Sequence, residues 1–227
     1  MKFAALIKYE FKDIFRNPAL WVLAILPVLM SKVVIQYMVG SAPISAVLPT
    51  WLLFAQVMVG IMISAPNLLE ERSSKTIDAL LVTPIGLRGV LVSKGLVVLL
   101  LSFLSQGLVI AINQPVKENS LVLIPLLVVG SALFIGVGMM IGLTLNSPKN
   151  GSALASSLMV LLFLAGTVSK ALPHWYHILR LIPSVDMVAD IEATMQSGGF
   201  LPFETITIFV WLLGIGTSIE LLIRRYR

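Results

Sequence analysis

The sequence predicts an all-α polytopic membrane protein, because its apolar content is too high for a soluble domain. Of the 227 residues, 58% are hydrophobic and only 12% are charged, whereas about 25% are charged in an average soluble protein. The mean hydropathy is +0.98. A helix needs about 20 apolar residues to cross a bilayer. The apolar stretches therefore predict six spans, at residues 19–39, 44–66, 90–112, 121–145, 151–168 and 205–223.

The residues before the first span, 1–17, predict an amphipathic helix that lies in the membrane interface. Lysines fall mostly on one face of this helix, and apolar residues recur at helical spacing on the other. The apolar residues are Phe3, Ile7, Phe11, Ile14 and Phe15. Asn17 and Pro18 end the helix, because proline lacks a backbone donor and disfavours the α conformation in the preceding residue.

Lysine and arginine residues beside the spans predict the orientation, because flanking positive charge is retained on the cytoplasmic side. Twelve lie on the side of the N-terminus and three on the opposite side. Both termini and residues 67–89 are therefore expected in the cytoplasm, in a multi-pass protein of the cell membrane. The net charge of +5 fits contact with anionic headgroups and does not require a nucleic-acid partner.

Residues 169–204, between spans five and six, predict an outer cap of two short amphipathic helices. Trp175 and Tyr176 are expected to anchor it at the interface. The acidic residues Asp186, Asp190 and Glu192 are expected to form a solvated external face. A direct role of this cap in substrate binding is the alternative.

Within the spans, a few polar or adaptable residues are candidates for a translocation path. Lys32 lies about 10 Å inside the outer end of span one. It either snorkels to the interface, bonds at a dimer face, or belongs to the path. Glycines in span four predict close helix contact. The full set of candidate path residues is Lys32, Gln36, Gln56, Met58, Ser64 and Ser156.

Residues 67–89 form a charged interruption between spans two and three. Ser73 and Ser74 are candidate N-caps for a helix over residues 75–82, and Thr83 and Pro84 end it. This helix would present Ile77, Leu80 and Leu81 beside charged neighbours. A short amphipathic helix of this kind suits insertion into a groove of a soluble partner. A helix lying on the headgroups is the alternative.

The same segment carries a pattern that resembles the signature of the ABC transporter type 2 permease family. The pattern is E-E-R-x-x-x-T-x-x-x-L-L-x-x-P followed by a lysine, here Glu70, Glu71, Arg72, Thr76, Leu80, Leu81, Pro84 and Lys94. The resemblance extends over essentially the whole chain. Lys75 stands where the family usually has glycine, and Asp78 where it usually has glutamate.

The resemblance implies a cytoplasmic coupling helix between spans two and three that sits in a cleft of an ATPase. It also implies that two permeases, identical or related, pair with two ATPases, most often in export. The implied ATPase-coupling residues are Glu70, Glu71, Arg72, Lys75, Thr76, Ile77, Asp78, Leu80, Leu81 and Pro84. The chain has no phosphate-loop motif. We therefore expect ATP and Mg²⁺ to be bound by a separate subunit, and no cofactor by this chain.

Together these features predict one transmembrane permease domain over residues 1–227, exporting a small amphiphilic or drug-like substrate. Its parts are residues 1–17, the interfacial helix; 19–66, spans one and two; 67–89, the coupling segment; 90–168, spans three to five; 169–204, the outer cap; and 205–227, span six with a basic tail.

Two other classes of protein fit the sequence less well. An ion-coupled secondary transporter or channel would need carboxylates near the middle of the membrane, and the predicted spans carry none there. An intramembrane enzyme would need a nucleophile, a base or a metal site, yet the two histidines, His174 and His177, lie in the outer cap. We therefore predict that the chain is not itself an enzyme and holds no metal.

Overall fold

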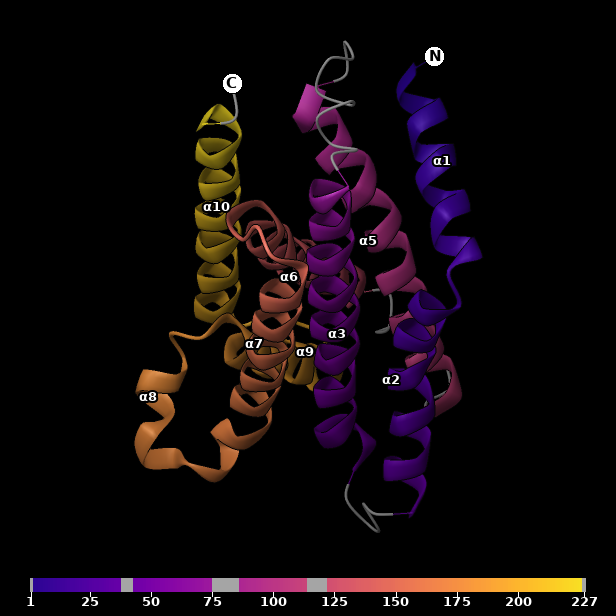
Figure 1. Cartoon of the computed structure of the whole chain (residues 1–227). Coiled ribbons are helices and arrows are strands. Elements are labelled where there is room, and N and C mark those ends of the chain that lie inside the picture. The colour runs from indigo at the N-terminus through magenta and orange to yellow at the C-terminus, as the bar shows by residue number, and fades with distance from the viewer. Residues whose placement is uncertain (1, 38–42, 75–85, 114–121, 226–227) are drawn as a thin grey trace.

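The computed structural model describes residues 2–37, 43–74, 86–113 and 122–225. Regular structure in these residues is helical throughout (Figure 1). The α-helices are α1 (Lys2–Arg16), α2 (Pro18–Tyr37), α3 (Ile44–Ser73), α5 (Gly86–Asn113), α6 (Ile124–Thr144), α7 (Pro148–Val168), α8 (Tyr176–Leu179), α9 (Pro183–Ser197) and α10 (Pro202–Arg225).

Six of the helices in the described residues are long and apolar enough to cross a membrane, namely α2, α3, α5, α6, α7 and α10. This confirms the predicted all-helical class and the six spans. Figure 1 shows both chain ends at the same end of the bundle, which we call the termini side. The opposite end, where α8 lies, is the cap side.

The α3 helix is longer than the span predicted for it. Its 30 residues make about 45 Å at about 1.5 Å per residue, against about 30 Å for a hydrocarbon core. Residues 67–73, which we expected to begin a separate segment, are the last two turns of this helix. Ser73, a candidate N-cap of the predicted helix over residues 75–82, is the final residue of α3.

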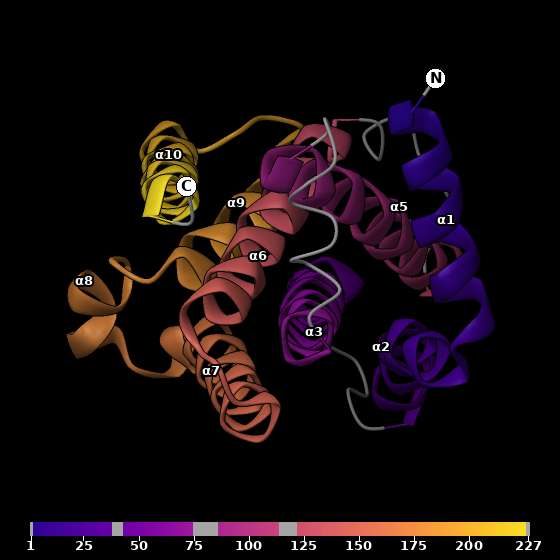
Figure 2. The same cartoon turned by 45° about the horizontal axis from the view of Figure 1, so that its top comes forward.

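The centre of the bundle is α3, which packs against α2, α5, α6, α7 and α9 (Figure 2). Its contact with α6 is close because glycines face it. A Cβ atom on Gly138 would lie 2.9 Å from Ser64 Cβ and 3.0 Å from the Gly60 carbonyl oxygen. The prediction of tight helix contact at the glycines of span four is thus confirmed, and a larger side chain here would push the two backbones apart.

The predicted N-terminal helix forms as α1 and packs along α5, while its place in the membrane interface stays a prediction. The Asn17 side chain accepts a hydrogen bond from the Ala19 backbone N–H at 3.1 Å, which satisfies a donor at the start of α2. Ile14 is buried.

The connection between α7 and α10 differs from the predicted outer cap. Two 3-10 turns and the four-residue α8 come first. The second helix, α9, packs between α3, α7 and α10 instead of lying on the surface (Figures 1 and 2). Met187 and Ile191 on α9 have no exposed surface.

The prediction of a solvated acidic face on this connection is wrong for two of its three residues. Asp186 and Asp190 are fully buried. Asp190 binds the start of α10, because its Oδ1 accepts from the Leu201 N–H at 2.7 Å and its Oδ2 from Thr205 Oγ1 at 2.6 Å. Glu192 remains partly exposed and pairs with Lys170.

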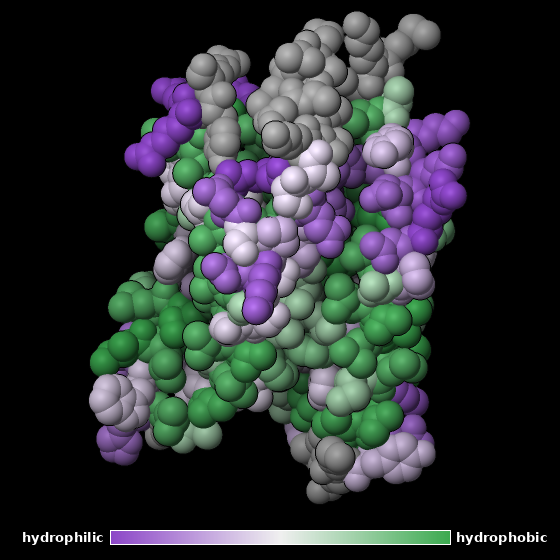
Figure 3. All heavy atoms as spheres, viewed as in Figure 1, coloured by the Kyte–Doolittle hydropathy of each residue, from purple (hydrophilic) through white to green (hydrophobic). Residues whose placement is uncertain are grey.

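The surface is divided between polar and apolar regions. Figure 3 shows hydrophilic side chains gathered towards the termini side and apolar ones over much of the remaining face. Large apolar side chains are exposed along α2, α7 and α10, among them Leu29, Leu161 and Leu213. Lipid or another membrane-embedded chain must cover them, because water would penalise this exposure.

Candidate functional site

The candidate site lies at the end of α3 on the termini side, where Glu70, Glu71 and Arg72 occupy its last turn. The serines that follow finish the helix, since Ser73 Oγ donates to the Glu70 carbonyl at 2.9 Å and Ser74 Oγ to the Glu71 carbonyl at 3.1 Å. The predicted coupling helix over residues 75–82, with Lys75, Thr76, Ile77, Asp78, Leu80 and Leu81, and Pro84 after it, lies outside the described residues.

Arg72 binds the end of α6. Its Nη1 donates to the carbonyl oxygens of Gly142, Leu143 and Leu145 at 2.9, 2.7 and 2.8 Å, and its Nη2 to Asn146 Oδ1 at 2.8 Å. The last carbonyls of a helix have no partner within the helix and carry its partial negative charge. A guanidinium satisfies several of them at once, so Arg72 fastens α3 to α6 and to the turn that enters α7.

Lys94 on α5 collects three partners from two other helices. Its Nζ donates to Glu71 Oε1 at 2.7 Å, to Glu10 Oε2 at 2.9 Å and to Asn67 Oδ1 at 3.2 Å. The Lys94 side chain is 6% exposed and that of Glu10 is 3% exposed. We call Glu10, Asn67, Glu71 and Lys94 the Lys94 cluster, and it joins α1, α3 and α5 at one point.

The family of the chain follows from a comparison of its sequence with models of known families. The model of the ABC-2 type transporter matches residues 1–189. The chain belongs to this family. A search of curated proteins found no match. The protein is therefore a membrane permease subunit of an ABC transporter, and a transport subunit of this kind is not itself catalytic.

Electrostatics make the Lys94 cluster of this ABC-2 permease sensitive to the loss of any member. Burial raises the pKa of the Glu10 carboxyl above its ordinary value, and the ammonium of Lys94 lowers it in part. Removing one partner of a buried ion pair typically costs about 3–5 kcal/mol, because the other charge stays buried without compensation. The second oxygen of Glu71, Oε2, has no hydrogen-bond partner in the part of the chain that the structure describes.

Sequence reasoning placed Glu71 and Lys94 in the motif but missed Glu10. Glu10 and its partner Lys94 are 84 positions apart, so no local pattern links them. A signal does exist, because Glu10 stands three residues after Ile7 and four before Ile14, within the apolar stripe of α1. An acidic residue on that stripe predicts a buried partner.

Glu70 differs from its neighbours. Its side chain is exposed, so it faces away from the contacts made by Glu71 and Arg72.

Gly86, where the described chain resumes at the start of α5, has a φ of 63°. Glycine suits this left-handed conformation because it has no Cβ.

The candidate path residues do not share one surface within a single chain. Lys32 and Gln36 are exposed on α2, and Lys32 Nζ donates to the Ile112 carbonyl at 3.3 Å. Gln56 is fully buried and donates to Gln106 Oε1 at 2.9 Å.

The other three candidates, like Gln56, face other parts of the protein. Met58 and Ser64 are buried on α3, and half-buried Ser156 donates to the Ser152 carbonyl at 2.8 Å. The path stays a prediction.

Among the described residues, no group of three or more His, Asp or Glu side chains could hold a metal ion.

Proposed function

We propose that this permease is an exporter of small amphiphilic or drug-like molecules, driven by a separate ABC-type ATPase that docks on residues 75–85, between α3 and α5. In this proposal the termini side faces the cytoplasm in the cell membrane, and two permease copies, identical or related, enclose the path. ATP and Mg²⁺ bind to the ATPase subunit.

The observation that carries the proposal is the set of contacts on both sides of the docking segment. Residues 75–85 leave the end of α3 and lead into α5. Glu71 and Lys94 connect these same two helices, and Arg72 connects α3 to α6. A displacement of this segment by the ATPase would therefore move α3, α5 and α6 together. It would also move α1, because Glu10 binds Lys94.

Co-purification from native membranes tests the partner. An ATP-binding protein of the ABC type is expected to accompany the tagged permease, and the purified pair is expected to hydrolyse ATP. Full transport by the permease alone, without an ATP-binding protein, would rule the proposal out.

Paired variants on α1 test the transmission. Glu10→Gln removes a buried charge from the Lys94 cluster, whereas Asp13→Asn changes an exposed carboxyl on the same helix. We expect Glu10→Gln to keep the ATPase bound but to lose most of the transport per ATP hydrolysed. Asp13→Asn should behave like the natural sequence. Equal coupling ratios for both variants would contradict the role of the cluster.

The absence of cysteine makes the orientation easy to test. Single cysteines at the exposed positions Ser73 and Ser197 can be labelled in intact cells with a membrane-impermeant maleimide. Ser197→Cys should react in intact cells, and Ser73→Cys only after the membrane is opened. The reverse pattern would show that the termini side faces outwards.

A further inference from the structure

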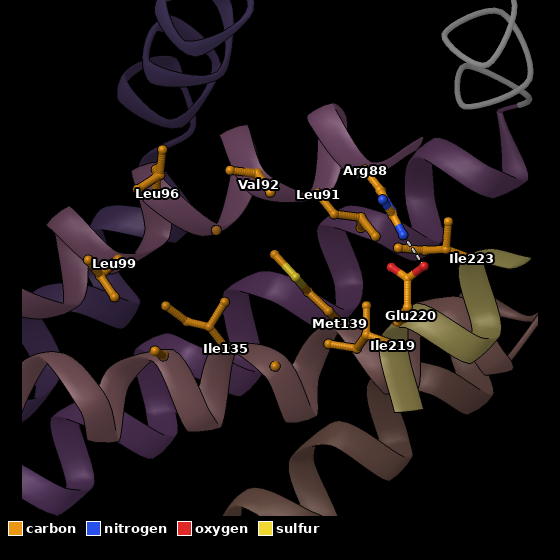
Figure 4. Close-up of a pocket in the computed structure, with 13 residues that line it drawn as sticks. Arg88, Leu91, Val92, Leu96, Leu99, Ile135, Met139, Ile219, Glu220 and Ile223 are labelled. Carbon is orange, nitrogen blue, oxygen red and sulfur yellow. Dashed lines mark hydrogen bonds and ion pairs between the residues drawn. The ribbon is translucent and has the colours of Figure 1, made fainter. Parts of the chain in front are cut away.

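A groove lies between α5, α6 and α10. Its volume is about 730 Å³. Figure 4 shows Arg88 and Glu220 facing each other at one end and Leu99 at the other. The wall between them is apolar and includes Val92, Leu96, Ile135, Met139 and Ile219.

The length of the groove matches one leaflet of a bilayer. Along α5 it runs from Arg88 to Leu99, which is about 16 Å at about 1.5 Å per residue. Half of a hydrocarbon core is about 15 Å. An acyl chain that enters from the headgroup level on the termini side would therefore reach the bottom of the groove near the middle of the bilayer.

The mouth of the groove has an excess of positive charge. Arg88 pairs with Glu220, and Arg224 Nε lies 3.3 Å from the same carboxylate. The arginine side chains are 59% and 70% exposed, so two guanidinium groups with free surface share one carboxylate. Guanidinium groups bind phosphate through paired hydrogen bonds.

The walls also require an apolar occupant. Val92 is 53% exposed and Leu96 is 42% exposed, although both line the groove. The α10 helix packs on α6 and α9, and the Arg88–Glu220 pair links it to α5. A polar ligand would make no favourable contact with this apolar wall, whereas an acyl chain would cover it.

We propose that this groove binds one anionic phospholipid from the leaflet on the termini side. The phosphate lies at Arg88 and Arg224, and one acyl chain lies along Val92 and Leu96. The lipid then fills the space between α5 and α10. None of the described residues that line the groove belongs to the Lys94 cluster.

Native mass spectrometry of the full-length purified protein tests the site, with phosphatidylglycerol and phosphatidylcholine of the same acyl chains as probes. Phosphatidylglycerol should be retained at about tenfold lower concentration, because both lipids carry the phosphate but the choline of phosphatidylcholine adds a positive charge that the two arginines repel. Equal retention of the two lipids would overturn the proposal. So would displacement of phosphatidylglycerol by millimolar inorganic phosphate, because the site would then bind a free anion.

Variants of the groove wall separate this site from general lipid contact. Val92→Trp, or Leu96→Trp if the first does not fold, should block the acyl chain and reduce retention of phosphatidylglycerol about tenfold. Leu104→Trp is the matched control, because Leu104 is exposed on the same helix and does not line the groove. Unchanged retention in both wall variants would overturn the proposal, and so would dissociation of a dimer, because a second copy would then be the occupant.

Variants of the mouth distinguish lipid binding from a purely structural ion pair. Both Arg88→Gln and Glu220→Gln break the pair, but they change the net charge in opposite directions. Arg88→Gln should lower retention of phosphatidylglycerol about tenfold, whereas Glu220→Gln should maintain or raise it. Arg16→Gln, at an exposed position on α1, serves as the control. Equal losses in both mouth variants would show that the ion pair only supports the fold.

Discussion

The two ends of the bundle both contain buried ionic contacts, but they satisfy them differently. On the termini side, Lys94 meets Glu10 and Glu71 at hydrogen-bond distance, at 2.9 and 2.7 Å. On the cap side, Arg180 binds Glu204 at 2.6 Å and lies 3.7 Å from Asp186. We call Arg180, Asp186 and Glu204 the Arg180 cluster.

The difference lies in the second carboxylate of each cluster. In the Lys94 cluster the lysine bonds to both carboxylates. In the Arg180 cluster Asp186 is fully buried without a close bond to the arginine. Burial raises the pKa of Asp186 to about 6, while Arg180 opposes the rise and Glu204 adds to it. The Lys94 cluster therefore pairs each carboxylate with the lysine, whereas the Arg180 cluster leaves one buried carboxyl with a raised pKa.

Of the changes that test this difference, replacement of Lys94 should have the largest effect on stability. Lys94→Met leaves the buried Glu10 and the partly buried Glu71 without a cation and should lower the free energy of unfolding by about 3–5 kcal/mol. Lys12→Met, at an exposed position of α1, should change it little. Thermal unfolding in detergent measures both.

The triple variant Lys94→Met, Glu10→Gln, Glu71→Gln removes all three charges and should recover most of this stability. We expect it to remain uncoupled from ATP hydrolysis. A single Lys94→Met variant as stable as the natural protein would show that the cluster is not a structural brace.

The second effect concerns pH. The folded-state pKa of Asp186 is raised to about 6 from 3.8, so between these values the folded protein binds a proton that the unfolded chain has lost. Stability must therefore fall as pH rises from about 4 to about 6 and stay low above that. Asp186→Asn should remove this fall and stabilise the protein at pH 7.5 by about 3 kcal/mol.

Unfolding temperatures measured between pH 4.5 and 7.5 check this difference between the two clusters. The natural protein and Asp186→Asn should converge at the acidic end of this range. Parallel curves for the two proteins would mean that Asp186 is ionised throughout the range.

The smallest effect concerns Asp190, the neighbour of the Arg180 cluster. Asp190→Asn keeps an acceptor but places an amide group against either the Leu201 N–H or the Thr205 hydroxyl. We expect a loss of about 1 kcal/mol, similar to the loss of a helix N-cap. Protection of the first amides of α10 in hydrogen exchange should fall, while the amides of α5 are unchanged. Loss of protection in both helices would indicate a global change in stability.

Much of the fold could be predicted because its signals are local. Six apolar stretches of the right length predicted six spans, and amphipathic spacing predicted α1. The glycines of span four predicted close helix contact there, without indicating which helix it meets. The E-E-R motif pointed to the end of α3, where Glu71 and Arg72 both make contacts between helices.

Other features depend on residues far apart in the chain. The apolar spacing from Val185 to Met195 correctly indicated a helix, but the same spacing suits a helix on the surface or in the bundle. Its burial between α3, α7 and α10 depends on the shapes of those three helices. For this reason the solvated face expected at Asp186 and Asp190 was wrong.

The sequence by itself determined that this protein is a six-span permease of the ABC-2 family, because hydropathy and the family pattern are properties of short segments. Only the tertiary structure decided which charges meet. Lys94 neutralises Glu10 across 84 positions of sequence, and Arg72 satisfies the carbonyls at the end of α6. A buried charge must find its partner in space, and several helices have to pack before that partner is defined.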